Sequence, residues 1–170
     1  MAGFRWPVSA RQTIGAPAAD VWSAIAASGN LESCHPFCAE NPVRIWPGPG
    51  SIDEVHYLNG IVYERRFQSW YEGEGYDLEI WHKQQKLADV IWRIEPTGDE
   101  SSVLEITVLP LGLQNLPTWL RWAPHVFVLR PRMKSYLQSV VRGFEWYVTR
   151  GESVPRNQFG THPWFSVQAR

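Results

Sequence analysis

The first part of the chain changes from a strand pattern to a helix pattern. Apolar and polar side chains alternate over Val8–Ile14, which predicts a short strand. Ala16-Pro17 then places a proline in the first turn of a helix, where the missing N–H costs nothing. Apolar residues follow at helical spacing as far as Gly29-Asn30, and Leu31–His35 adds one more predicted turn.

The middle of the chain has the pattern of strands joined by short turns. The predicted strands are Val43–Trp46, Ile52–Leu58, Ile61–Trp70, Tyr76–His82, Leu87–Glu95 and Val103–Leu109. Asn59-Gly60 separates two of them and is typical of a two-residue type I′ hairpin turn. Consecutive strands with short connections predict an antiparallel meander.

The last third returns to helical periodicity. Apolar residues recur every three or four positions between Met133 and Val148, so one long amphipathic helix is predicted over Pro131–Arg150. Gly151 is placed to cap its C-terminus.

Two further segments flank this predicted helix. Thr118–Leu129 is apolar but interrupted by Pro124, which predicts a kinked helix or a lid-like loop. Glu152–Arg170 is a tail rich in aromatic residues, and leaving it free would expose apolar surface. We expect the tail to pack on the domain or on a partner subunit, so a homodimer stays open.

Composition limits the class of protein. The chain has 170 residues, 44% of them hydrophobic, and includes ten Trp. This length favours one domain with a sizeable core. The net charge of −1 gives no electrostatic case for a nucleic-acid partner. No apolar run approaches 18 residues and the start has no apolar signal segment, so we expect no membrane insertion and a cytoplasmic protein.

These elements together predict an α+β fold, in which a curved antiparallel sheet of seven strands wraps around the long C-terminal helix. The stretch QTIGAPAADVW at Gln12–Trp22 resembles the opening of domains of the START / polyketide-cyclase (SRPBCC) superfamily. The element order β-α-α-β6-α and the glycine turn at Gly48–Ser51 are similar too. The resemblance covers Val8–Arg150.

The resemblance implies a helix-grip fold with an interior pocket for lipids, hormones, polyketides or aromatic compounds. Residues 1–150 would form one ligand-binding domain, and residues 151–170 its aromatic tail. Members of this superfamily include enzymes and pure binders, so the fold leaves the activity open.

A two-residue turn at Asn59-Gly60 fixes which side chains of the hairpin share a face. One face holds Asp53, Val55 and Tyr57 opposite Arg66, Glu64 and Val62, and the other holds Ile52, Glu54 and His56 opposite Phe67, Arg65 and Tyr63. Each face carries one carboxylate–arginine pair, so periodicity leaves the inner face open. The step Tyr63–Arg66 is similar to a Glu-Arg step in plant hormone receptors of the superfamily, which implies that Glu64 points inward together with Val62, Arg66 and Gln68.

The candidate site follows from this inner face. Glu64, Arg66 and His82 are the candidates for proton transfer and carbonyl polarisation. The candidate ligand contacts are His35, Tyr57, Val62, Tyr76, Leu78, Trp92, His125, Tyr136 and Val140. The alternative is that Asp53, Glu64 and Arg66 form a structural ion network. Tyr76, Leu78, Ile80 and His82 are expected on the inner face, followed by Val90, Trp92, Ile94, Leu104, Ile106 and Val108.

No cofactor is expected. The segment Cys34–Cys38 (CHPFC) contains two thiols and an imidazole, but the second ligand pair of a zinc site is missing nearby. Gly48–Ser51 lacks the Gly-Lys-Ser/Thr of a phosphate loop.

Three kinds of function remain. The first is a module that binds a hydrophobic, aromatic or polyketide-like small molecule. The second is a cyclase/dehydratase (aromatase) enzyme that works without metal or nucleotide. The third is an interaction protein with an exposed patch near Trp119 and Trp122. Trp81 and Trp146 fall off the predicted core faces, which indicates a docked tail or a subunit interface.

Overall fold

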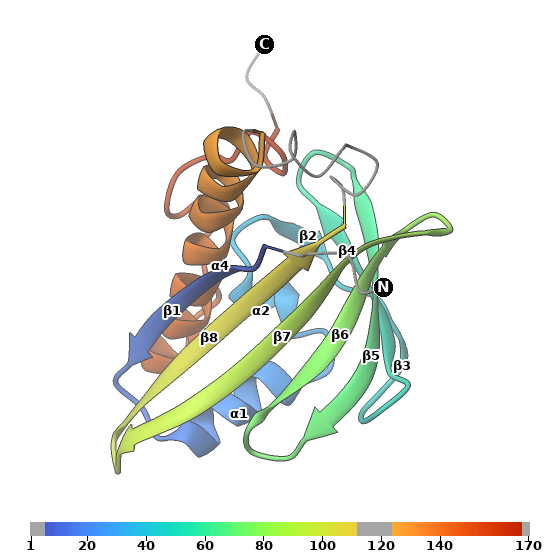
Figure 1. Cartoon of the computed structure of the whole chain (residues 1–170). Helices are drawn as coiled ribbons and strands as arrows, with labels where there is room; N and C mark the ends of the chain where they lie inside the picture. The colour runs from blue at the N-terminus through green and yellow to red at the C-terminus, as the bar shows by residue number, and fades with distance from the viewer. Residues whose placement is uncertain (1–5, 112–123, 168–170) are drawn as a thin grey trace.

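A curved antiparallel sheet holds the long C-terminal helix in the computed structural model, which describes residues 6–111 and 124–167 (Figure 1). The strands are β1 (Val8–Ile14), β2 (Cys38–Glu40), β3 (Val43–Ile45), β4 (Ile52–Tyr57), β5 (Val62–Tyr71), β6 (Gly75–His82), β7 (Gln85–Gly98) and β8 (Ser101–Pro110). They pair in the order β1-β8-β7-β6-β5-β4-β2, and β3 pairs with β4 beside this path. The predicted α+β helix-grip fold is confirmed, and β2 is a short strand beyond the seven predicted.

The helices lie on the concave side of the sheet. They are α1 (Ala18–Ala26), α2 (Leu31–Cys34) and α4 (Arg130–Arg150), which a π-helical turn, η2 (His125–Leu129), leads into. Gly151 has a φ of 69° and ends α4, because its N–H bonds the carbonyl of Tyr147 at 2.8 Å. None of the helices in the described part of the chain is both long and apolar enough to span a membrane.

The segment Thr118–Leu129 is described only from residue 124 onward. The residues that are described end in η2, which continues directly into α4. The prediction of a lid or patch around Trp119 and Trp122 therefore lies outside the described residues.

The core lies between the sheet and the helices. Most inner positions predicted on β6, β7 and β8 are buried as expected, from Tyr76 and Leu78 to Ile106 and Val108, whereas Ile80 and His82 are half-buried. Across the core, the ring centroids of Trp92 on β7 and Phe144 on α4 lie 5.2 Å apart.

The loop that joins β4 to β5 is one residue longer than predicted. The N–H of Tyr57 bonds the carbonyl of Ile61 at 2.8 Å, and Gly60 takes a φ of 85°. The loop is therefore Leu58–Gly60, a three-residue type with glycine in the left-handed position. Leu58 is drawn out of the ladder because its N–H bonds the carbonyl of Phe37 at 3.0 Å.

This shift exchanges the two faces of β5 relative to the prediction. Asp53 now lies opposite Arg65, and Val55 opposite Tyr63. A one-residue slip moves every side chain of a strand to the other face. The predicted inward orientation of Val62, Glu64, Arg66 and Gln68 is therefore wrong, and Tyr63, Arg65 and Phe67 point inward instead.

The tail folds back along the domain. The N–H of Val154 bonds the carbonyl of Ser33 at 2.8 Å, and the N–H of Asn157 bonds that of Pro36 at 2.9 Å. Further along, the ring of Phe159 lies 4.1 Å below the guanidinium of Arg142 on α4 and 6.5 Å from the ring of Trp146. The docked tail thus accounts for Trp146 lying off the core face of its helix.

Trp81 has its own partners on the outer face of the sheet. The guanidinium of Arg66 stacks over its ring at 4.2 Å, and its Nε1–H donates to Glu79 at 2.9 Å. These contacts account for the position of Trp81 without a subunit interface.

Replacing Gly143 with Ala is expected to destabilise the fold by about 1–3 kcal/mol, because a Cβ here would lie 2.1 Å from the main-chain oxygen of Cys34. The close approach of α2 and α4 requires glycine at this position. Urea unfolding followed by circular dichroism measures the loss. Gly15→Ala is the matched control, since a Cβ there has no neighbour within 4 Å, and its stability should stay within about 0.5 kcal/mol of wild type. Equal effects of the two substitutions would contradict the tight packing.

Candidate functional site

A cavity of about 640 Å³ lies between the sheet and α4. Its size falls in the range typical of small-molecule sites. Most of its wall is apolar and comes from β6, β7, β8 and α4, including Leu78, Val90, Trp92, Ile106, Val108 and Val140. The sheet curvature and the long helix together create this space, as the helix-grip order leads one to expect.

The predicted ligand contacts divide into three groups. Those that line the cavity are His35, Tyr57, Leu78, Trp92, Tyr136 and Val140. Val62 lies on the outer face of β5, and Tyr76 is buried outside the cavity with its hydroxyl donating to the carbonyl of Ile25 at 3.3 Å. The side chain of His125 lies outside the described residues.

The three predicted catalytic residues, Glu64, Arg66 and His82, do not meet at the cavity. Glu64 and Arg66 pair with each other on the outer face, where Arg44 also donates to Glu64 at 3.1 Å. His82 stands beyond the cavity rim, with Nδ1 2.9 Å from the carbonyl oxygen of Val62 and its ring 5.5 Å from that of Tyr63. The expectation that these three residues face the ligand together is corrected: the longer hairpin loop turns Glu64 and Arg66 outward, and His82, at the end of β6, is not part of the lining.

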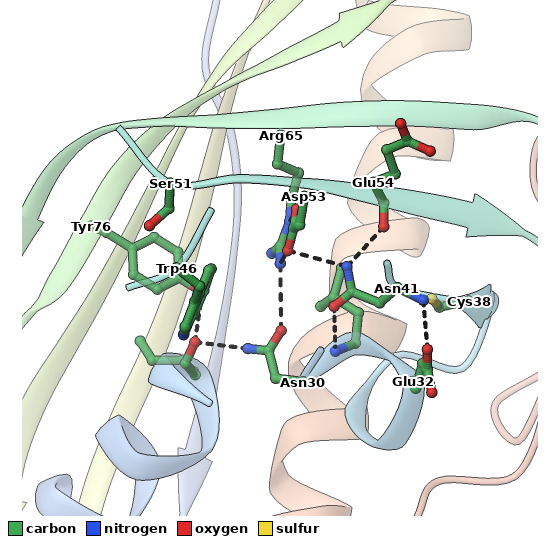
Figure 2. A network of polar contacts seen from close by, with 12 residues as sticks. Asn30, Glu32, Cys38, Asn41, Trp46, Ser51, Asp53, Glu54, Arg65 and Tyr76 are labelled. Atoms are coloured by element: carbon green, nitrogen blue, oxygen red, sulfur yellow. Dashed lines mark hydrogen bonds and ion pairs between the residues drawn. The ribbon is translucent and has the colours of Figure 1, made fainter. Parts of the chain in front are cut away.

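The buried ion pair of the domain is formed by Asp53 and Arg65 instead (Figure 2). Arg65 Nε–H donates to Asp53 Oδ1 at 2.7 Å, and Nη2 forms a second bond to Oδ2. Both side chains are almost fully buried, at 3% and 0% exposure. Burial alone would lower the pKa of Arg65, but the Asp53 carboxylate raises it above its usual range.

Two asparagines hold this pair in place, as Figure 2 shows. Asn41 Nδ2 donates to Asp53 at 3.1 Å and to the carbonyl of Glu54 at 2.8 Å. Asn30 accepts from Arg65 at 3.4 Å and donates to the carbonyl of Ile25 at 2.7 Å. The sequence prediction missed both asparagines, since their roles depend on contacts far apart in the chain. Buried polar groups of this kind are normally satisfied, which favours a structural role for most of the network.

A second polar group lies in the cavity lining, close enough to Arg65 for its charge to act on His35. His35 Nε2 lies 2.9 Å from the hydroxyl of Tyr136, and this hydroxyl lies 2.8 Å from that of Tyr57. All three side chains line the cavity. The chain of contacts joins the end of α2, helix α4 and strand β4, so only the tertiary structure assembles it.

Burial fixes the protonation states of this group. Desolvation lowers the pKa of His35 to about 3, with a further contribution from the positive charge of Arg65. Desolvation also raises the pKa of Tyr57 and that of Tyr136 well above their usual range. Near neutral pH, the imidazole is therefore uncharged and both phenols keep their protons.

The tail closes one side of the cavity, with Pro163, Trp164 and Phe165 in its lining. The ring of Phe165 is stacked on that of Tyr57 at 4.2 Å and lies 4.6 Å from that of Tyr136. Asn59 at the hairpin tip holds the tail, because its Nδ2 donates to the carbonyl of Trp164 at 2.6 Å. Of the two placements that the sequence left open for the tail, on the domain or on a partner subunit, the structure shows contact with the domain at the cavity.

The cysteine segment forms neither a metal cluster nor a reactive centre in the described part of the chain. No three His, Cys, Asp or Glu side chains gather there to hold a metal ion. Burial raises the pKa of the Cys38 thiol to about 12 and that of Cys34 above its usual range, so both stay protonated.

No family model and no curated protein matches the sequence. Solved structures with the same fold include DynU16, a protein of the dynemicin biosynthetic locus, at 13% identity and a TM-score of 0.65, with 86% of this chain and 48% of that chain covered. The chain thus spans about half the length of DynU16. The Zhui aromatase/cyclase from Streptomyces sp. R1128 is 16% identical, with a TM-score of 0.61 and coverage of 89% and 100%.

Norcoclaurine synthase from Thalictrum flavum, solved in complex with dopamine and hydroxybenzaldehyde, is also similar. It is 13% identical, with a TM-score of 0.63 and coverage of 89% of this chain and 90% of that one. At these identities the likeness concerns the fold. The chain shares the helix-grip fold with these proteins, as the resemblance noted in its sequence implied.

Proposed function

We propose that this protein binds a hydrophobic, aromatic or polyketide-like small molecule in the cavity between the sheet and α4. The observation that carries this proposal is the cavity itself, about 640 Å³ in volume and walled mainly by apolar side chains. Apolar walls with a few polar groups at fixed points are the usual composition of a ligand site. Two proteins of the same fold support the proposal, one an aromatase/cyclase and one solved with two small aromatic compounds.

The ionisation states of the lining support binding rather than proton transfer. His35 is neutral over the whole physiological range because its pKa is lowered to about 3. Tyr57 and Tyr136 have raised pKa values, and Arg65 is neutralised by Asp53. A general acid or base works best when its pKa lies near the working pH. Since Glu64 and Arg66 lie outside the cavity, we do not assign them a catalytic role.

A search for the natural ligand is the first test of this proposal. We expect native mass spectrometry of the purified protein to detect a bound small molecule, or to detect one after incubation with aromatic ketones. Protein that stays free of every compound offered would contradict a ligand-binding function.

A cavity-filling substitution is the second test. Ala88→Trp introduces an indole from β7 into the cavity and is expected to weaken binding of 2-acetylnaphthalene at least tenfold, measured by isothermal titration calorimetry. Ile91→Trp places the same side chain on the outer face of the same strand and should change the Kd by less than about twofold. Equal effects of the two substitutions would place the binding site elsewhere. Circular dichroism checks that both variants are folded.

A further inference from the structure

The polar group formed by His35, Tyr136 and Tyr57 holds three hydrogen-bond donors but only two contacts in which they can donate. The main-chain N–H of Phe37 donates to His35 Nδ1 at 3.1 Å. A neutral imidazole has one N–H and one lone-pair nitrogen. Because Nδ1 accepts, the ring proton of the uncharged His35 must lie on Nε2. His35 Nε2–H therefore donates to the hydroxyl oxygen of Tyr136.

The two hydroxyl groups then share a single contact. The oxygens of Tyr136 and Tyr57 lie 2.8 Å apart, so one of the two O–H groups donates to the other. The second O–H has no acceptor among the residues that the structure describes. Whichever way the contact runs, one phenolic hydrogen is left over, and both phenols line the cavity.

A buried donor without a partner is costly, by about 1–3 kcal/mol. Tyr57 and Tyr136 are nonetheless positioned firmly, since Phe165 of the tail is stacked on Tyr57 and Phe37 lies stacked 6.0 Å from Tyr136. The neighbouring Arg65 adds another donor, because its Nη1 is buried without a partner among the described residues. Two donors at this side of the cavity, one phenolic O–H and Arg65 Nη1, therefore have no acceptor among the described residues.

We infer that the ligand carries a neutral carbonyl oxygen, of a ketone or an aldehyde, which accepts the phenolic hydrogen left free by Tyr57 and Tyr136. This inference rests on the proposed function and names the chemistry of its ligand. A carbonyl brings acceptors only and meets the free phenolic hydrogen directly, whereas a hydroxyl would also bring a hydrogen that needs an acceptor of its own.

Charge excludes a carboxylate at the same place. The positive charge of Arg65 is already paired with Asp53, and the other lining groups of this corner are neutral. A buried carboxylate without a countercharge is strongly disfavoured. The rest of the ligand would then extend along the apolar wall formed by Leu78, Val90 and Ile106.

A matched pair of probes tests this inference. 2-Acetylnaphthalene and 2-isopropenylnaphthalene have nearly the same shape, but C=CH2 replaces C=O in the second. Calorimetry gives the ratio of their affinities, which is insensitive to changes in cavity size. We expect Tyr57→Phe/Tyr136→Phe to reduce the preference for the ketone by about tenfold relative to wild type.

Tyr76→Phe is the matched control, because Tyr76 is a buried tyrosine whose hydroxyl bonds a main-chain carbonyl outside the cavity. It should keep the wild-type ratio. If the double variant also keeps that ratio while binding both probes, the inference is overturned and the proposed function stands. If neither probe binds wild type, both fail.

An infrared measurement of the bound ketone tests the same hydrogen bond in the wild-type protein, without any substitution. The carbonyl stretch of 13C-labelled 2-acetylnaphthalene shifts to lower frequency when the oxygen accepts a hydrogen bond. We expect this shift, relative to the ketone in hexane, in the complex with the wild-type protein. A frequency equal to that in hexane would overturn the inference.

Discussion

Replacing Asp53 with Ala is expected to lower the free energy of unfolding by about 3–5 kcal/mol, the largest loss we predict for any single substitution in this protein. The change leaves the guanidinium of Arg65 buried at 3% exposure without its countercharge. Asn41 would also lose the acceptor that it bonds at 3.1 Å. Urea unfolding at pH 7, followed by circular dichroism, measures the loss.

Glu64→Ala is the control for this prediction. Glu64 forms an ion pair with an arginine two residues along the same strand, but on the outer face and in contact with the more exposed Arg44. Pairs near the surface contribute about 0–1 kcal/mol, so a much smaller loss is expected. The apolar double variant Asp53→Leu/Arg65→Met should recover most of the stability lost in Asp53→Ala, because it removes both charges. Equal losses in Asp53→Ala and Glu64→Ala would contradict the burial assigned to the inner pair.

Replacing both Trp164 and Phe165 with Ala is expected to raise the dissociation rate constant of cavity-bound 2-acetylnaphthalene by about 100-fold. These two rings line the cavity and close it on the side of the tail. Each buried aromatic side chain contributes about 1.5–3 kcal/mol, and about 1.4 kcal/mol corresponds to a factor of ten. Affinity changes within one site are expressed mainly in dissociation, which stopped-flow fluorescence measures directly.

Phe159→Ala separates closure of the cavity from attachment of the tail. Phe159 belongs to the same tail but packs against Arg142 on α4 and does not line the cavity. Its removal should change the dissociation rate constant by less than about threefold. An unchanged rate in the Trp164→Ala/Phe165→Ala variant would show that the tail does not retain the ligand.

Much of the fold could be predicted from local patterns. Alternation over Val8–Ile14 and the three- and four-residue spacing after Pro131 set the type of each element, since strand and helix periods differ. Alternation also indicated that Leu78, Trp92 and Ile106 share the inner face of the sheet. Helical spacing indicated that Tyr136 and Val140 share the apolar face of their helix. Six of the nine predicted ligand contacts line the cavity, and periodicity accounts for four of them, Leu78, Trp92, Tyr136 and Val140.

The length of the hairpin loop at Asn59-Gly60 decides which side chains of β5 face the cavity. Two- and three-residue loops share the same glycine signal. Leu58 belongs to the loop in this structure because its N–H bonds the carbonyl of Phe37, in a distant part of the chain, and not the partner strand. In this register Arg65 points inward and Arg66 outward, so the predicted inward orientation of Glu64 and Arg66 was wrong.

The sequence by itself determined the order and periodicity of the elements, and with them the helix-grip fold and an apolar cavity. Only the tertiary structure decided which polar groups reach that cavity. His35, Tyr136 and Tyr57 come from three elements that meet through packing, and the tail brings Phe165 over them. Local patterns fix the direction of a side chain within its own element, whereas register and docking depend on contacts between distant segments.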